Sequence, residues 1–451
     1  MRKLPSPGEI TRIRREALLN RAIEAYKFFY PTVSMVMNFE ALEKYGAEVN
    51  RGLLIQLTTP AQVSLTQNSD TPYGLGWIDV EAEPVVVEVP AGPTMGVVND
   101  TFFQYVTDLG LVGEEQGAGA KYLFVAPDYD GEIPEGYLVR RLKTLHALIA
   151  TRAPFPDPAQ GKALLRELQV YPLSEAANPG PTMFRDTSEV PSVANPCEVD
   201  GTFAVWEAIK RALDMEVPSR EFYNSLGMLA DLGIRKGVTF EPSSEMIDIL
   251  TEAARIADEQ LVVAAFASRE PERLVWPDRR WEWVVFSDGE SGYYEPDFLR
   301  LSVRERWFYQ ATLETPKMFR HSEGSGSLYW LGNLDAAGEA LDGGNSYALT
   351  IPAPVPAAQF WSVTVYDLDT RSEIDAPQFT PLITSLRDHL VPNADGNLVL
   401  HFGPDAPADS AAPWVQTVPG SQWFAYFRLY GPGAEAFDGS WKPSDFTRTE
   451  S

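Results

Sequence analysis

Short apolar runs bounded by turn-forming residues fill both ends of the chain, and they constrain its fold more than any other feature. Between residues 53 and 150 they include GLGWIDVEAEPVVVEVPAG, TMGVVNDTFFQYVTDLG and KYLFVAPDYDG. After Tyr294 they return as NSYALTIPA, QFWSVTVYDLD, NLVLHFG and QWFAYFRLYG. Runs of this length, separated by Pro, Gly, Asn and Asp, are typical of β-strands with their turns. Their spacing favours a β-sandwich in the first region and a jelly roll or similar sandwich in the second.

Helical spacing characterises the rest of the sequence. Residues 11–48 form one predicted helical segment, which we expect Pro31 to interrupt. Between about residues 155 and 285, apolar residues recur at steps of three and four in AQGKALLRELQVYPL, GTFAVWEAIKRALDM, REFYNSLGMLADLGI and SSEMIDILTEAARIADEQLVVAAFA. The last of these begins after an N-cap signal at Ser243 and is expected to bury Met246, Leu250, Ala253 and Ala257. Residues 178–196 are rich in Pro and are expected to be a loop.

The chain has 451 residues, which is too long for one compact core. We therefore expect a mainly β protein with a helical insert, divided into four parts. The predicted parts are a helical segment at 1–50, a β-sandwich at 51–150, a mainly helical region at 151–285 and a jelly roll at 286–451.

Charge and cysteine content limit the partners. The formal net charge is −26, with 63 acidic and 37 basic residues, so we expect neither nucleic acid nor a membrane as a partner. The single cysteine, Cys197, allows no intrachain disulfide. The first 20 residues are charged and lack the apolar stretch of a signal peptide. These features predict a cytoplasmic protein, although an exported protein whose leader had been removed would have the same sequence.

Two groups of motifs carry a resemblance to known families. The first group is QNSDTPY at 67–73, Trp77-Ile78-Asp79 followed by EPVVVEVP, and the pair Gln104 and Asp108. It resembles the family called domain of unknown function 1254. The second group, GGNSYALTIPAPVPAAQFWSVTVYD, NADGNLVLHFGP and WFAYFRLYGPGAEAFDGSWKP, is similar to domain of unknown function 1214. The resemblance implies an immunoglobulin-like N-terminal sandwich, a helical insert and a C-terminal jelly roll.

The block at 67–73 contains the first candidate site residues, namely Asn68, Asp70, Thr71 and Tyr73. Asn, Asp and Thr side chains often bond to local backbone, so the block could be a shaped turn before a strand. Alternatively, Asp70 is a general acid or base beside Tyr73, and Asn68 and Thr71 orient the substrate.

Two further aspartates extend this candidate catalytic group. Asp79 and Asp108, with Gln104 as a substrate-binding residue, could join Asp70 if the strands that carry them are adjacent. Paired carboxylates in a dry cleft raise one pKa, as acid–base catalysis requires. Three aspartates could equally hold a weakly bound Ca²⁺ or Mg²⁺.

The run Trp423–Tyr430 supplies the C-terminal candidates. Alternation places Trp423, Ala425, Phe427 and Leu429 on one face, expected to be the core, and Phe424, Tyr426, Arg428 and Tyr430 on the other. An arginine between two tyrosines could bind a carboxylate or an aromatic ligand, with Tyr366 at the rim. The alternative is an arginine that joins two domains. Trp281 and Trp283 could similarly form a sugar platform or join the helical and β regions.

Several common sites are excluded. The four histidines are scattered, and no HExxH or GxSxG motif occurs, so a classical zinc hydrolase or α/β-hydrolase is not predicted. A Rossmann fingerprint is also absent, and we expect no organic cofactor.

Two classes of function are compatible with these residues. One is a cofactor-independent enzyme that carries out hydrolase- or lyase-type acid–base chemistry on a small molecule at an inter-domain cleft. The other is a non-catalytic protein that binds a small molecule or carbohydrate, or that assembles as a homo-oligomer. If Asp70, Asp79 and Asp108 gather around one pocket, the first is favoured; if they lie apart, the second is.

Overall fold

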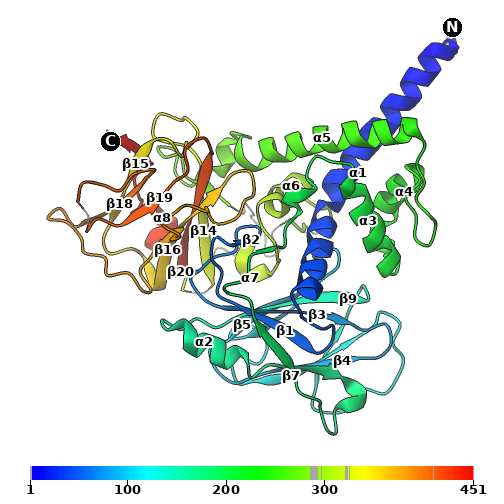
Figure 1. The fold of residues 1–451 in the computed structure, drawn as a ribbon, viewed down its shortest axis with the longest axis horizontal. Helices are drawn as coiled ribbons and strands as arrows, with labels where there is room; N and C mark the ends of the chain where they lie inside the picture. Colours follow the sequence, from blue (N-terminus) through cyan, green and yellow to red (C-terminus); the bar gives the residue numbers. More distant parts are fainter. Residues whose placement is uncertain are drawn as a thin grey trace.

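The computed structural model describes residues 3–284, 293–295, 297–319, 323–324, 326–409 and 411–449. It contains an N-terminal β region, a C-terminal β region and a group of helices that packs against both (Figure 1). Among the described residues, no helix is long and apolar enough to cross a membrane.

The N-terminal β region has two main sheets. The larger has the order β11-β1-β3-β9-β5-β6 and the smaller the order β10-β4-β7-β8. Their strands are β1 (Gly52–Gln56), β3 (Tyr73–Asp79), β4 (Val85–Val89), β5 (Met95–Asp100), β6 (Tyr105–Gly110), β7 (Ala120–Val125), β8 (Leu138–Arg141), β9 (His146–Arg152), β10 (Gln169–Pro172) and β11 (Met183–Asp186). A two-stranded sheet pairs β2 (Gln62–Val63) with β12 (Ser192–Val193).

Alternation gives the larger sheet two different faces. Ile55, Ile78 and Ile149 lie on the face that shares a core with Val85 and other side chains of the smaller sheet. The opposite face carries Tyr73, Trp77, Arg152 and Leu148 toward the helices and the C-terminal region. One face of this sheet therefore belongs to the core of the N-terminal region, and the other face belongs to the core shared with the helices and the C-terminal region.

The C-terminal β region also has two sheets, with the orders β13-β14-β20-β16-β17 and β19-β18-β15-β21. The strands are β13 (Glu282–Trp283), β14 (Ser327–Gly332), β15 (Ser346–Pro352), β16 (Ala357–Asp367), β17 (Leu382–Thr384), β18 (Asn397–Gly403), β19 (Trp414–Gln416), β20 (Trp423–Pro432) and β21 (Thr447–Thr449). Both sheets contribute side chains to one core, including Trp330, Phe427 and Leu400.

The described residues form eight helices. They are α1 (Pro7–Lys44), α2 (Pro158–Leu165), α3 (Ala204–Met215), α4 (Tyr223–Asp231), α5 (Ser244–Phe266), α6 (Leu301–Gln310), α7 (Pro316–Phe319) and α8 (Glu435–Asp438). Of these, α1, α3, α4, α5 and α6 pack together as the helical layer. Single 3-10 turns lie at Leu173–Glu175, Pro196–Glu198, Arg220–Phe222 and Pro271–Arg273. Helices α1, α3, α5 and α6 share a core with Leu148 of β9 and with Phe424 and Tyr426 of β20.

The predicted arrangement of β regions with helices between them is confirmed at this level. The Ser243 side chain caps α5, which buries Leu250, Ala253 and Ala257 as expected, with Met246 partly buried. Trp281 lies in the C-terminal core rather than on an exposed platform.

Three local expectations were wrong. Helix α1 continues through Pro31, which is buried, because a proline inside a helix removes one hydrogen bond without necessarily ending it when tertiary packing compensates. The helix predicted over AQGKALLRELQVYPL ends at Leu165, and its last part is strand β10 on the edge of the smaller sheet. The segment 178–196, expected to be a loop, includes the short strands β11 and β12.

A buried ion pair fastens the helical layer to the larger sheet. Nδ1 of His146 lies 2.9 Å from Oε1 of Glu216, the residue that follows α3. Oε2 of Glu216 also accepts a hydrogen bond from the backbone N–H of Leu145. Burial lowers the pKa of His146, but the hydrogen bond and charge of Glu216, with the charges of Asp79 and Glu81, raise it overall.

We predict that Glu216→Gln destabilises the protein by about 1–3 kcal/mol below pH 6, because a buried charged partner is lost. A raised folded-state pKa means that the stabilisation by His146 is complete below its unfolded value of about 6.5 and is lost as the pH rises through the folded-state value. Urea unfolding of both proteins at several pH values measures this. If the difference in unfolding free energy between the wild type and Glu216→Gln is the same from about pH 5.5 to pH 8.5, His146 and Glu216 do not form the pH-dependent ion pair described here.

Candidate functional site

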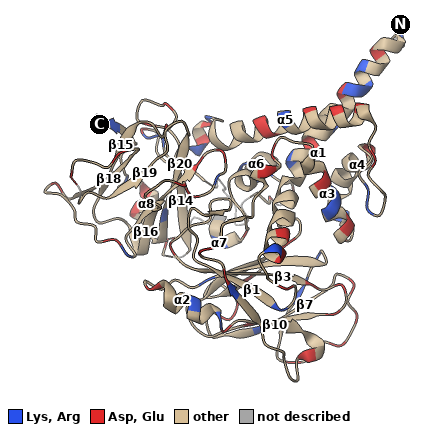
Figure 2. Cartoon of the chain, viewed as in Figure 1, with Lys and Arg blue, Asp and Glu red and all other residues tan. Residues whose placement is uncertain are grey.

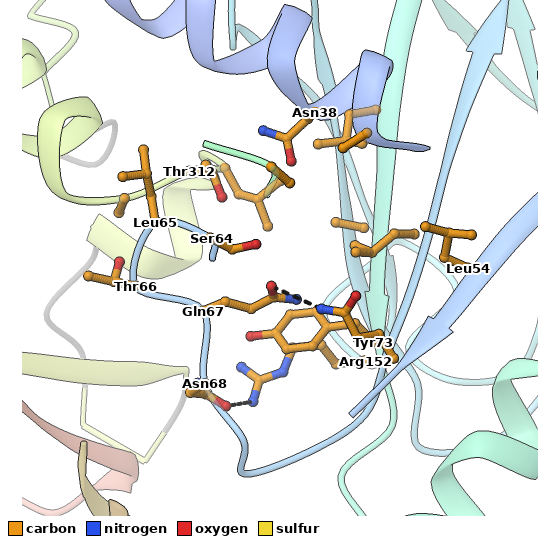
Figure 3. A pocket seen from close by; sticks show the side chains of 18 of the residues that line it. Asn38, Leu54, Ser64, Leu65, Thr66, Gln67, Asn68, Tyr73, Arg152 and Thr312 are labelled. Carbon is orange, nitrogen blue, oxygen red and sulfur yellow. Dashed lines mark hydrogen bonds between the residues drawn. The ribbon is translucent and has the colours of Figure 1, made fainter. Parts of the chain in front are cut away.

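The candidate site is a chamber where the two β regions and the helices meet. Its floor is the loop 64–72, which leads from β2 into β3 (Figure 3). Asn38 of α1 and Trp307 of α6 line it from the helical layer, and Tyr329 and Arg428 line it from the C-terminal sheet.

Arg152 enters the chamber from the end of β9. Its cross-strand partner is Tyr73, and the centre of its guanidinium lies 4.9 Å from the centroid of the Tyr73 ring. Nε donates to Oγ1 of Thr71 at 2.8 Å. Nη2 donates to Oδ1 of Asn68 at 2.9 Å (Figure 3). The sheet register and the loop together fix this side chain.

Arg428 enters from the C-terminal sheet. It lies between Tyr329 of β14 and Ser362 of β16 in the strand register, and its side chain is buried. Nη1 donates to Oγ1 of Thr364 at 3.1 Å, and Nη2 donates to the carbonyl of Thr66 at 2.9 Å. The guanidinium also lies within 5.6 Å of the ring centroids of Tyr329, Tyr366 and Tyr426.

The partners of these two arginines are neutral. Within the described part of the chain, neither guanidinium makes a salt bridge within 4.0 Å. Two fully buried arginines elsewhere behave differently: Arg273 pairs with Glu282 at 2.8 Å and Arg371 with Asp200 at 2.5 Å. Because a charge away from water is costly without a counter-charge, Arg152 and Arg428 are the arginines of this region that have room to interact with an anion.

The chamber has two adjoining cavities. The first measures about 100 Å³ and contains both arginines together with Leu54, Leu75 and Leu148 among its apolar walls. The second measures about 300 Å³ and includes Asp108, Lys317 and Tyr430. Tyr73, Arg152 and Tyr329 line both, so these side chains stand between them. The combined space suits a molecule with a charged group and an apolar body.

Asp70 lies behind the chamber floor. Its side chain is fully buried, and Oδ2 accepts a hydrogen bond from Oγ of Ser362 at 2.8 Å. Oδ1 has no hydrogen-bond partner among the residues that the structure describes. Asp70 does not line either cavity, but its charge interacts with both Arg152 and Arg428.

Glu373 is a second buried carboxyl group beside this loop. Oε2 accepts a hydrogen bond from Oγ of Ser69 at 2.5 Å, and Oε1 has no partner. Burial raises the pKa of Glu373 to about 8, against the opposing effects of Ser69 and Arg428. At neutral pH the group is therefore mostly uncharged, which leaves Asp70 as the nearby counter-charge.

The candidate residues from the sequence divide into two sets. Those gathered around the loop 64–72 are Asn68, Asp70, Thr71, Tyr73, Tyr366, Tyr426, Arg428 and Tyr430. Asp108 lines the second cavity, where its Oδ1 accepts from Oγ1 of Thr315 at 2.6 Å.

Asp79 and Gln104 lie outside this group. Asp79 is at the opposite end of β3 from Tyr73, and its Oδ2 lies 3.7 Å from Nε2 of His146. Nε2 of Gln104 donates to Oε2 of Glu221 at 2.9 Å. The three aspartates therefore do not form one cluster, and no group of three or more His, Cys, Asp or Glu side chains in the described ranges could hold a metal ion.

Arg152, Tyr329 and Glu373 were not among the sequence candidates. Arg152 closes an ordinary apolar strand, HALIATR, and its importance depends on the register that sets it opposite Tyr73. The alternation in SLYWLG places Tyr329 on the face opposite Leu328 and Trp330. The sequence of one strand does not reveal the register in which it pairs or the sheet that it faces.

These features define a class of protein with two β regions that enclose a chamber against a helical layer. Residues 50–172 match the family described as DUF1254, and residues 326–434 match the family described as protein of unknown function (DUF1214). The chain therefore belongs to the proteins that carry these two domains in this order, and the resemblance found in the sequence is confirmed.

A solved structure shares the fold of this chain. The crystal structure of the VPA0106 protein from Vibrio parahaemolyticus is similar over 96% of this chain and 100% of that one, with 18% identity and a TM-score of 0.58. An uncharacterized protein from Burkholderia cenocepacia matches over 98% of this chain and 96% of its own, with 12% identity and a TM-score of 0.43. The comparison with curated proteins gives no match.

We predict that Asp70→Asn lowers the unfolding free energy by about 1–3 kcal/mol, because it removes a buried counter-charge near two arginines. Ser362→Ala removes only the hydrogen bond to Oδ2 and is the control, with an expected loss of about 1 kcal/mol. Urea midpoints give both values. If Asp70→Asn costs no more than Ser362→Ala, Asp70 acts only through its hydrogen bond.

Proposed function

We propose that the chamber binds a small organic acid, with its carboxylate between Arg152 and Arg428 and its body against the tyrosines and leucines. The observation that carries the proposal is a pair of guanidiniums, buried Arg428 and half-buried Arg152, whose hydrogen-bond partners among the described residues are neutral. The proposed binding needs no organic cofactor.

The geometry of the arginines supports a carboxylate. A guanidinium has five N–H donors in a planar fork that matches a carboxylate, and each of these arginines uses only two N–H groups in the hydrogen bonds described above. Both are attached to the same loop, Arg428 through Thr66 and Arg152 through Asn68 and Thr71. The remaining donors are therefore held in place before a ligand arrives, which lowers the entropic cost of binding.

The net charge of the protein makes this chamber unusual. The chain carries −26 overall, so an anion receives no general attraction from the surface. Selective binding then depends on the local field of the buried arginines, which is screened less by solvent than surface charges are. A neutral sugar would gain little from them, so the chamber favours an acid over an uncharged carbohydrate.

Aromatic walls select the body of the ligand. Tyr73, Tyr329 and Tyr426 line the first cavity, together with Leu54, Leu75 and Trp307. Flat rings and branched side chains favour an aromatic or branched apolar group over a strongly polar one. The proposed ligand class is thus a monocarboxylate with an aromatic or aliphatic body.

We predict that a carboxylate from a panel of aliphatic and aromatic acids raises the melting temperature, whereas its matched primary amide does not. Arg152→Gln and Arg428→Gln should each weaken binding about tenfold or more, since a charge-assisted hydrogen bond contributes about 1.5–3 kcal/mol. Calorimetry measures the affinities. Arg152→Lys keeps the positive charge but lacks the planar set of N–H donors. Its affinity should therefore lie between those of the wild type and of Arg152→Gln.

Arg140→Gln is the matched control, because Arg140 contacts Glu114 and Tyr122 in the N-terminal region and lines neither cavity. Its affinity should equal that of the wild type. A panel in which acids and amides bind equally, or in which the chamber variants bind as tightly as the control, would contradict the proposal.

Asp108 favours a second function, an enzyme of acid–base type. This carboxyl group lines the second cavity beside Arg152. Burial raises its pKa, although hydrogen bonds from Thr315 and Tyr105 act in the opposite direction. A carboxyl group with a perturbed pKa in a cavity can transfer a proton to or from a bound acid held by Arg152.

If the protein is such an enzyme, Asp108→Asn should reduce turnover of a bound acid about 100-fold or more and leave its affinity within about threefold. Mass spectrometry of each binding acid after incubation with the protein measures turnover. Thr315→Ala removes the hydrogen bond to Asp108 and should shift the pH dependence without abolishing turnover. If acids bind but remain chemically unchanged, the enzyme function is contradicted and only the binding function is supported.

We also propose that the N-terminal β region is an immunoglobulin-like sandwich and that the C-terminal β region is a jelly roll. Two sheets that share one core in each region support this. The parallel pairs β1 with β11 and β7 with β8 depart from a purely antiparallel immunoglobulin-like arrangement.

A further inference from the structure

The first turns of α1 extend beyond the rest of the protein. In Figure 1 the N-terminal turns of this helix project away from every other element. Residues 7–21, here called the arm, contain no buried residue, whereas burial begins at Ala22. At 1.5 Å per residue the arm is about 22 Å long.

The sequence specifies the start of the arm. Ser6 and Glu9 form a capping box, in which a carboxylate oxygen of Glu9 accepts hydrogen bonds from the backbone N–H of Ser6 at 2.8 Å and from its hydroxyl at 2.6 Å. Such a cap satisfies backbone donors at a helix end. An exposed segment of this length gains little stability from its own hydrogen bonds, so most helical stability of this kind comes from packing.

The arm has a charge opposite to that of the rest of the chain. Residues 7–21 contain four basic and two acidic residues, although the whole chain carries −26. In Figure 2 the ribbon of the projecting turns carries blue segments, which mark Lys and Arg. Arg15 already contacts Glu252 of α5, and it also interacts with Asp248 and Glu245 on the same helix. The arm therefore complements an acidic helical surface of the kind that this chain itself presents.

Apolar side chains accompany these charges. Ile13 on the arm is 44% exposed, and Ile247 at the start of α5 is 41% exposed. Ile10, Ile13 and Ala17 are spaced so that they follow one side of the helix. An apolar strip flanked by charges is typical of a helix that packs on a partner.

We propose that the arm packs against a second copy of this chain and holds a homo-oligomer together. The second copy supplies a surface that complements the arm, with acidic residues and exposed apolar side chains on α5. This interaction is independent of the chamber and of any ligand. Arm residues such as Ile13 lie outside the lining of both chamber cavities.

Sedimentation equilibrium of the full chain tests the proposal. The wild-type chain should form an oligomer at micromolar concentration, and Ile13→Asp should raise its dissociation constant about tenfold or more, since burying a charge opposes association. Val391→Asp is the matched control, because Val391 is 70% exposed in the C-terminal region. It should leave the dissociation constant unchanged. Circular dichroism before each run confirms that both variants are folded.

Charge reversal provides a second test that leaves the apolar strip intact. Arg14→Glu, at an exposed position on the arm, should also raise the dissociation constant, and about 1 M salt should weaken the wild-type oligomer because the Debye length falls to about 3 Å. A wild-type chain that is monomeric, or an oligomer that neither variant weakens, would overturn the proposal. Binding of the wild-type chain to phosphatidylserine-containing vesicles, lost in Arg14→Glu while the oligomer persists, would assign the arm to a lipid surface and overturn it as well.

Discussion

Strand β20 is buried along its whole length, and the rest of the structure depends on its two faces. Trp423, Ala425, Phe427 and Leu429 complete the core of the C-terminal region. Phe424 and Tyr426 enter the core that the helices share with the N-terminal sheet, and Arg428 lies between them and Tyr430 along the strand. Because successive side chains point in opposite directions, this strand contributes to the core of the C-terminal region with one face and to the chamber wall with the other.

Burial on both faces also explains how a positive charge is kept in the protein interior. Arg428 is attached to the N-terminal region through the carbonyl of Thr66 and to its own sheet through Thr364. Three tyrosine rings lie around its guanidinium, and Asp70 is close enough to attract it without a direct salt bridge. Ring faces and a distant carboxylate compensate only part of the desolvation cost of this charge.

Sequence reasoning predicted the elements more reliably than their assembly. Period-two alternation identified β20 and assigned its two faces correctly, since every second position contacts one core. The polar block at 67–73 was recognised as a candidate site, and its side chains do contact the arginines of the chamber. Arg152 was missed because its role depends on lying opposite Tyr73 across a strand pair separated by about 80 residues of sequence. The expected interruption at Pro31 was wrong for a related reason. The low helix propensity of proline is overridden when the helix is packed on several sides.

The chamber walls come from distant parts of the chain, and this has a consequence for folding. Asn68 and Tyr430, which are 362 residues apart, are joined by a hydrogen bond, and Thr66 and Arg428 by another. Contacts of such high sequence separation require the entropy of long loops to be lost first, so they form late. Each β region can collapse around its own core, whereas the chamber exists only after both have docked. If the chamber binds the ligand proposed for it, binding therefore marks the completion of folding.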